Sequence, residues 1–408
     1  MHKLMKIIVA FLISFLAIIQ PTKSSYALDF DEILKDIQNL PVEKISFKKY
    51  EKLRAVQIFV LPKTPDELEA QMKIWKEVGI NTLILRVFHN EGDRYHFFLN
   101  SDIKKGVYFK TYKAPIIVDA LAYFIPLAKK YGFKVFAWMT TRYADFKNGT
   151  LEKVIAYSPE KKTYYTAKGL NILSDEVQKY IISLYLDLSA YPIDGILLQD
   201  DLFLRFNEGF DHKSILRFKE ETNLDVTPEM LFNTNGNGNG IKYNEHFWKW
   251  RKWKSKEIAK FVSNLSKEVK KINPSINIAV NLTYESITHP KGALAWLAHD
   301  INEFKNVSDY FSLMAYHRQI MDELKISLED TLDYLDNMVE KSIEYFPEEP
   351  ERVLFKIQIK DWKTNQAIDE KEIKRLIHST KNLKKMSIAI VPYPPEIPYE
   401  TVKDFFID

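Results

Sequence analysis

After residue 53, short apolar runs alternate eight times with longer amphipathic stretches. The runs have the length and β-branched composition of buried strands, and the stretches repeat apolar residues at helical spacing. This alternation predicts repeated βα units around a parallel sheet. The expected strands are Ala55–Leu61, Asn81–Phe88, Lys134–Thr140, Asp194–Asp201, Asn277–Leu282, Tyr310–Tyr316, Arg352–Lys360 and Ser387–Tyr393.

Two of the amphipathic stretches carry clear helix boundary signals. Pro65 begins the first one and Gly79 ends it, with apolar residues at helical spacing between them. Ser174 is the expected N-cap of a second helix that runs to Ala190. Helix therefore alternates with strand in these units.

Eight such units favour a (β/α)8 TIM barrel over a doubly wound sheet, because no glycine-rich phosphate loop follows the first strand. We expect a single barrel domain over residues 53–408, preceded by a charged lead-in at 28–52. An insertion at about 202–245 contains the stretch Asn233–Gly240, whose alternating Asn and Gly residues indicate a flexible loop tip.

Residues 1–27 have the pattern of a secretory signal peptide. A basic start precedes the apolar run Ile7–Ile19, and small residues at Ser25 and Ala27 suit cleavage after Ala27. An uncleaved anchor is the alternative, and both interpretations place the protein outside the cytoplasm. The chain has no Cys, so it forms no disulfide and has no lipid-bearing cysteine after the signal. From the signal-peptide pattern we expect a periplasmic or secreted protein that is not a lipoprotein.

The net charge of +3 gives no strong field for recruiting nucleic acid or an anionic membrane. The nine His residues are scattered without metal-ligand spacing. We therefore expect neither a nucleic-acid partner, nor a metal, nor a cofactor.

Two adjacent carboxylates, Asp200 and Asp201, end the fourth expected strand. In a TIM barrel the loops at the carboxyl ends of the strands form the active site. Strand alternation assigns Gln199 and Asp201 to the barrel mouth and turns Asp200 beside them into the loop. Repulsion between the two carboxylates would raise the pKa of one of them, as a general acid requires. The competing interpretation is a helix cap or a salt bridge to Arg86 or Arg205.

The same alternation predicts further polar side chains inside the barrel. Their number argues against a purely structural interior, since buried polar groups are costly unless they are paired. They are Gln57, Arg86, Asn281, Tyr316, Lys356 and Gln358.

Tryptophans that follow or end strands are candidates for stacking on sugar rings. These are Trp138, Trp296 and Trp362. We assign the tryptophans within helical patterns to ordinary packing, and these are Trp75, Trp248, Trp250 and Trp253.

Several segments, in order along the chain, resemble the C-terminal hydrolase domain of PgaB, an exopolysaccharide-processing family. The segment that ends in Gln199-Asp-Asp201 resembles that family's F-H-D-D motif, with Gln in place of the usual His. The other matching segments are Ala295-Trp-Leu-Ala298 before Asp300-Ile-Asn-Glu-Phe304, Leu313-Met-Ala-Tyr316, and Phe355-Lys-Ile-Gln-Ile-Lys-Asp-Trp362.

The resemblance implies an endo-acting hydrolase of partially de-N-acetylated poly-β-1,6-N-acetylglucosamine, a biofilm exopolysaccharide. It implies catalysis by Asp200 and Asp201, tryptophans Trp296 and Trp362 along a groove, and proximity to exopolysaccharide export machinery. The family's namesake also carries a metal-dependent deacetylase domain. Nothing here supplies the length or ligands of that domain, so we expect no deacetylase activity.

On this basis Asp201 would protonate the leaving oxygen while Asp200 orients a water or the substrate's acetamido group. A paired-carboxylate mechanism would add Asp361 or Glu285, whereas a substrate-assisted mechanism would use the acetamido oxygen. A chitinase-like hydrolase fits less well, because Gln199 stands where its central Asp is expected. A non-catalytic polysaccharide-binding barrel is the third alternative.

Overall fold

The computed structural model describes residues 50–62, 64–93, 103–147, 151–233, 240–393 and 399–406. The predicted signal peptide, nearly all of the lead-in and residues 234–239 of the expected loop tip lie outside these ranges. Within them, no helix is both long and apolar enough to cross a membrane.

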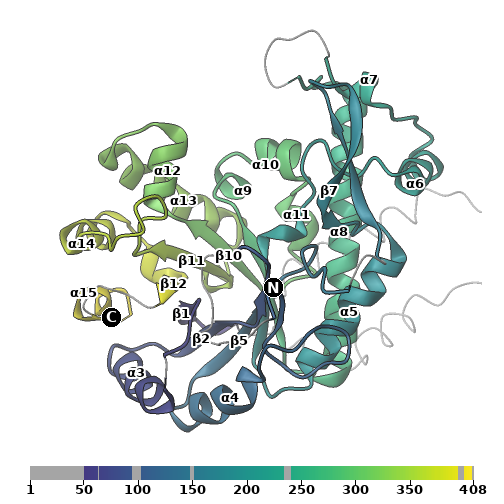
Figure 1. Cartoon of the computed structure of the whole chain (residues 1–408). Helices are drawn as coiled ribbons and strands as arrows, with labels where there is room; N and C mark the ends of the chain where they lie inside the picture. Colours follow the sequence, from purple (N-terminus) through teal and green to yellow (C-terminus); the bar gives the residue numbers. More distant parts are fainter. Residues whose placement is uncertain are drawn as a thin grey trace, which may run out of the picture. The chain divides into compact units, whose positions relative to one another are not determined.

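Eight parallel strands form a closed barrel, as Figure 1 shows. The barrel closes where the first strand pairs with the last, with Ala55 opposite Ala389. This closure confirms the TIM barrel and excludes the doubly wound sheet. In chain order the strands are β1 (Arg54–Ile58), β2 (Thr82–Arg86), β5 (Lys134–Met139), β8 (Gly195–Leu198), β9 (Asn277–Leu282), β10 (Tyr310–Ala315), β11 (Val353–Gln358) and β12 (Ser387–Tyr393).

The helices of the βα units surround the strands (Figure 1). The two helices with clear boundary signals form as predicted. Thr64 caps α3 (Pro65–Glu77) in a capping box with Glu67, and Ser174 is the N-cap of α5 (Asp175–Ser189). The other long helices are α4 (Ala120–Lys130), α8 (Glu245–Ile272), α13 (Leu328–Tyr345) and α14 (Glu370–Ser379).

Further helices lie in the connections. They are α6 (His212–Thr222), α7 (Pro228–Leu231), α9 (Glu285–Thr288), α10 (Pro290–Leu297), α11 (Ile301–Phe304), α12 (His317–Leu324) and α15 (Tyr399–Lys403), with 3-10 helices η1 (Asp200–Leu202), η2 (Pro350–Arg352) and η3 (Leu383–Lys385). Helices α6 and α7 form much of the predicted insertion after β8. Trp75, Trp250 and Trp253 are buried, which confirms their structural assignment.

Two small antiparallel pairs were not predicted. The hairpin of β6 (Lys153–Ser158) and β7 (Thr163–Leu170) follows β5, and β3 (Phe88–His89) pairs with β4 (Gly106–Val107). An isolated bridge between Ala156 and Glu208 joins the hairpin to the insertion after β8. The loops after the third and fourth barrel strands are therefore joined into one projection, which extends beside α8 in Figure 1.

Candidate functional site

A cavity of about 240 Å³ lies at the carboxyl end of the barrel. Its walls come from strand ends or from the residues that directly follow them, as in other TIM barrels. The lining residues are Gln57, Phe59, Trp138, Gln199, Asp200, Asn281, Met314, Tyr316, Lys356 and Trp362. Six of the predicted site residues meet here: Asp200, Gln199, Trp138, Trp362, Asn281 and Tyr316.

The structure corrects the assignment of the two aspartates, because Asp200 lines the cavity and Asp201 does not. Strand β8 ends at Leu198, and η1 begins at Asp200. Successive side chains diverge by about 120° in a 3-10 helix, compared with about 180° in a strand. Alternation is therefore valid as far as Gln199, which does line the cavity, and fails at the next residue.

Asp201 is buried and its carboxylate is held by the chain that follows β5. It accepts hydrogen bonds from the hydroxyls of Thr140 and Thr141, both at 2.7 Å. The backbone N–H groups of Thr141 and Tyr143 also donate to it, at 3.0 Å and 2.7 Å respectively. These bonds occupy both carboxylate oxygens, so Asp201 fixes the loop that carries Asp200.

The pKa of Asp200 is raised, first by desolvation and then by the charge of Asp201, while Lys356 opposes the rise. The Asp200 side chain is nevertheless exposed to solvent at the mouth of the cavity. The protein atoms crowded around the barrel mouth still disfavour its charged form. A carboxyl group that holds its proton toward neutral pH can act as a general acid.

Lys356 is the counter-charge of this cavity. Its side chain is 1% exposed, and its ammonium donates to Asn281 Oδ1 at 2.8 Å. Burial lowers the pKa of Lys356 to about 7, although the negative charge of Asp200 partly opposes this by raising the same pKa. The ammonium also lies 5.5 Å from the ring centroid of Tyr316, whose own pKa is raised by burial and by Asp200.

Aromatic side chains form one wall of the cavity. The indole N–H of Trp138 donates to Gln199 Oε1, so Gln199 holds this ring in place. Phe59 packs between two tryptophans, with centroids 4.9 Å from Trp138 and 6.3 Å from Trp362. Phe59 and Met314 were not predicted from the sequence, although the position of Phe59 directly after β1 was an available signal.

A second cavity, of about 300 Å³, shares Trp362 with the first one. It receives Asp361 and Gln358 from the end of β11, together with residues of α12. Asp361 Oδ1 accepts the N–H groups of Lys363 and Thr364, at 2.7 Å and 3.1 Å, and so closes a turn. Gln358 is fully buried and its side-chain oxygen has no partner among the described residues.

Besides Asp201, three predicted site residues line neither cavity. Arg86 is buried and forms an ion pair with Asp93 at 3.5 Å, so its interior carboxylate partner lies in the loop after β3. Trp296 is 42% exposed on α10, with its ring 4.9 Å from that of Phe206. Glu285 begins α9. Among the described residues, no cluster of His, Cys, Asp and Glu could hold a metal ion.

A TIM barrel with an acid and sugar-sized aromatic surfaces at its carboxyl end has the architecture of a glycoside hydrolase. The model of hypothetical glycosyl hydrolase family 13 matches residues 65–393. The chain belongs to this family.

Individual proteins share part of the sequence or the fold with this chain. The chain is 26% identical over 310 residues to the poly-beta-1,6-N-acetyl-D-glucosamine N-deacetylase of Escherichia coli K12, which covers 73% of this chain and 42% of that protein. The chain thus spans well under half the length of this relative. The glycoside hydrolase domain of PgaB (BpsB) from Bordetella bronchiseptica has the same fold, with a TM-score of 0.67 and 17% identity over 87% of this chain and 99% of that one. The catalytic domain of a Paenibacillus polymyxa β-amylase is more distant, with a TM-score of 0.51 and 11% identity over 86% and 95% of the two chains.

Proposed function

We propose that this chain is an exported, endo-acting glycosidase of β-1,6-linked, partially de-N-acetylated poly-N-acetylglucosamine. Family membership and the polymer named for the E. coli relative support the substrate class. Two cavities that share Trp362 provide room for consecutive sugars of a chain, which suits endo cleavage. The signal-peptide pattern supports a periplasmic or secreted location near exopolysaccharide export machinery.

The observation that carries the proposal is the position of Asp200. It is the sole carboxylate among the described residues that line the first cavity. Its raised pKa suits a general acid that protonates the leaving oxygen. We therefore assign the acid role to Asp200 and a positioning role to Asp201, the reverse of the expectation from strand alternation.

The proposal includes a substrate-assisted mechanism. A paired-carboxylate mechanism needs a second carboxyl group about 5–9.5 Å across the same site. Asp361 lies in the neighbouring cavity, and Glu285 lines neither cavity. The 2-acetamido oxygen of the sugar would then act as the nucleophile, with the Tyr316 hydroxyl as a hydrogen-bond donor to it.

A polysaccharide-binding barrel without catalysis is the second candidate. It is favoured by Gln199, which cannot donate a proton as the His of the resembled family can and which is already bonded to Trp138. In such a protein the aromatic wall would bind the polymer while the bond remains intact.

Incubation with partly deacetylated β-1,6-glucosamine polymer, followed by mass spectrometry of the products, separates these candidates. We expect wild-type protein to release shorter oligosaccharides, and Asp200→Asn to lower the rate by roughly 100-fold or more, the usual contribution of a general acid. Asp361→Asn separates the two mechanisms, because a substrate-assisted enzyme should retain cleavage in this variant and a paired-carboxylate enzyme should lose it.

Equal rates for wild type and Asp200→Asn would remove Asp200 as the acid. Retention on immobilised polymer without products would favour the binding barrel. Products from chitin oligomers alone would indicate a chitinase-like specificity.

A further inference from the structure

A third pocket, of about 440 Å³, is at the opposite end of the barrel from Asp200. Its residues precede strands: Tyr50 lies before β1, Asp309 before β10 and Arg352 before β11. Because all barrel strands are parallel, this is the amino-terminal end, whereas Asp200 follows the carboxyl end of β8. The pocket therefore plays no part in the proposed hydrolysis.

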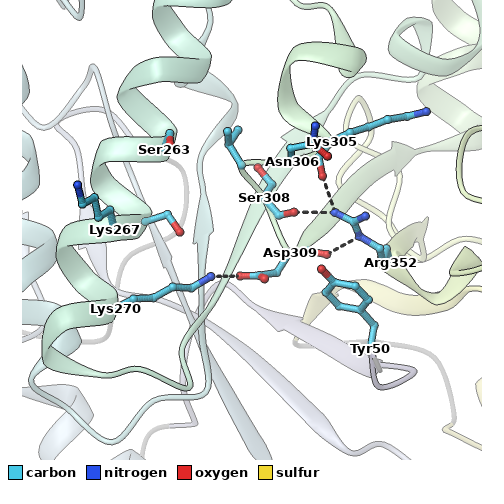
Figure 2. Close-up of a pocket in the computed structure, with 11 residues that line it drawn as sticks. Tyr50, Ser263, Lys267, Lys270, Lys305, Asn306, Ser308, Asp309 and Arg352 are labelled. Carbon is cyan, nitrogen blue, oxygen red and sulfur yellow. Dashed lines mark hydrogen bonds and ion pairs between the residues drawn. The ribbon is translucent and has the colours of Figure 1, made fainter. Parts of the chain in front are cut away.

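Helix α8 forms one wall of this pocket (Figure 2). Four of its lining residues are spaced as i, i+3, i+4 and i+7, which places them on one helix face. They are Ser263, Ser266, Lys267 and Lys270. The opposite wall is the loop from Lys305 to Asp309, which leads into β10.

Two of the positively charged side chains that line the pocket are already in ion pairs. Lys270 pairs with Asp309 at 2.9 Å, and Arg352 pairs with Glu349 at 3.3 Å. Figure 2 shows the Arg352 guanidinium directed at the main chain of the loop, where it donates to the carbonyl oxygens of Asp309, Ser308 and Lys305 at 3.0, 2.7 and 2.8 Å. These bonds make the loop a rigid wall.

Two positive charges remain without a carboxylate partner. Neither Lys267 nor Lys305 forms an ion pair with any described residue. Lys267 is exposed at the rim, and the Lys305 ammonium rests over the ring of Tyr345, 4.9 Å from its centroid. Both side chains are long and flexible enough to turn toward an anion in the pocket.

Ser308 supplies a buried donor that is not used. Its side chain is 5% exposed and lines the pocket, yet its hydroxyl has no hydrogen-bond partner among the described residues. A buried polar group without a partner is costly and uncommon in folded proteins. A rotation about the Cα–Cβ bond of Ser308 would bring this hydroxyl to the pocket surface, where an oxygen-rich ligand would accept its hydrogen bond.

We propose that this pocket binds a phosphate group. A phosphate monoester carries about −1.5 to −2 charges and three strong acceptor oxygens, which matches two unpaired lysines and a free hydroxyl donor. A single carboxylate would leave one of these charges without a partner. The phosphate is either that of a soluble molecule or that of a lipid headgroup.

Calorimetric titration of the full chain with inorganic phosphate, at constant ionic strength, tests the proposal. We expect saturable binding that weakens about tenfold in Lys267→Gln and in Ser308→Ala, since each loses one hydrogen bond to a charged group. Lys256→Gln is the matched control, because it removes an exposed charge from α8 outside the pocket and should bind as wild type. Ser308→Ala should also unfold no earlier than wild type, because its hydroxyl bonds to no described residue.

Vesicles that contain phosphatidic acid, whose headgroup is a phosphate monoester, distinguish the two sources. Vesicle binding that is lost in Lys267→Gln and Ser308→Ala identifies a lipid headgroup, whereas phosphate binding without vesicle binding identifies a soluble ligand. Absence of saturable phosphate binding, or equal affinity in all four proteins, overturns the proposal. Polymer hydrolysis should be the same in all four, so the result is independent of the proposed glycosidase activity.

Discussion

The carboxylate of Asp201 accepts a hydrogen bond from the hydroxyl of Thr140 at 2.7 Å, across the gap between β8 and the end of β5. This bond joins two neighbouring barrel strands at the point where both enter their loops. Because Thr141 and Tyr143 donate to the same carboxylate, Asp201 acts as a clamp that holds the start of the loop after β8 to the start of the loop after β5. Its neighbour Asp200 is thereby directed into the cavity.

Asp201→Asn should therefore lower stability more than an ordinary surface substitution. The amide offers one acceptor oxygen where the carboxylate offers two, so at least one buried donor loses its partner. We expect a loss of about 1–3 kcal/mol in the free energy of unfolding, measured by urea denaturation. Activity should fall as well, because Asp200 would no longer be held in place.

Asp361→Asn is the control for this change. Asp361 also accepts two backbone N–H groups, but both bond to the single oxygen Oδ1, which Asn retains. Its stability should remain within about 0.5 kcal/mol of wild type. Equal stability of the Asp201 and Asp361 variants would contradict the clamp.

The charge of Lys356 should set the alkaline limit of activity. Lys356 lowers the pKa of Asp200, opposing desolvation and the charge of Asp201, which raise it. In Lys356→Met the pKa of Asp200 should rise further, so the acid keeps its proton to higher pH. We expect the alkaline limb of the kcat/KM profile to move to higher pH, although the rate itself falls because Asn281 loses its hydrogen-bond donor. A shift toward lower pH would contradict the assignment of Asp200 as the acid.

The same lysine predicts a stability profile. Its pKa is about 7 in the folded protein and about 10.4 in an unfolded chain. Between those pH values the unfolded state binds more protons, so the contribution of Lys356 makes unfolding free energy rise with pH. As the pH is raised from 7 to 10, the free energy of unfolding of wild type, measured by urea denaturation, should increase relative to that of Lys356→Met. A constant difference would show that the ammonium is not desolvated.

Trp362 should contribute to substrate affinity more than Trp296. Trp362 lines both cavities, whereas Trp296 lines neither. Loss of one aromatic stacking surface corresponds to about 1.5 kcal/mol, or roughly tenfold in affinity. We expect Trp362→Ala to raise KM for the polymer about tenfold and Trp296→Ala to change it less than threefold. The reverse order would place the binding surface on α10.

Regular strand geometry explains which site residues could be predicted from the sequence. Asn281 and Lys356 lie within strands, where the two-residue alternation assigns them correctly to the interior. Asp200 is the first residue of a 3-10 helix, where that alternation no longer applies. Alternation predicts that a side chain points into the barrel, but it does not predict how far along the barrel axis the side chain lies. Arg86 is buried as predicted, yet it pairs with Asp93 and does not line the cavity.

The structure of the loops could be predicted from the sequence less well than that of the barrel strands. The β6–β7 hairpin contains β-branched and aromatic residues that are typical of strands. It interrupts the βα repeat by which the barrel is recognised in the sequence. Its contact with the insertion after β8, the bridge from Ala156 to Glu208, joins residues far apart in sequence. Such pairing depends on packing that short-range patterns do not encode.

Gly195 is required by packing inside the barrel. It is opposite Phe136 in the register of β5 and β8, and a Cβ at this position would overlap the Phe136 ring. That ring is 1% exposed and packs edge-on against Tyr310, with centroids 6.1 Å apart, so it has little room to move. Gly195→Ala should destabilise the protein by about 1–3 kcal/mol, the usual cost of overpacking a core.

Gly292→Ala is the control, since its Cβ would meet only His289 at 3.7 Å within α10, where Ala is the better helix former. Thermal unfolding of both variants tests this, and a Gly195→Ala protein as stable as Gly292→Ala would show that the β5–β8 interface can adjust.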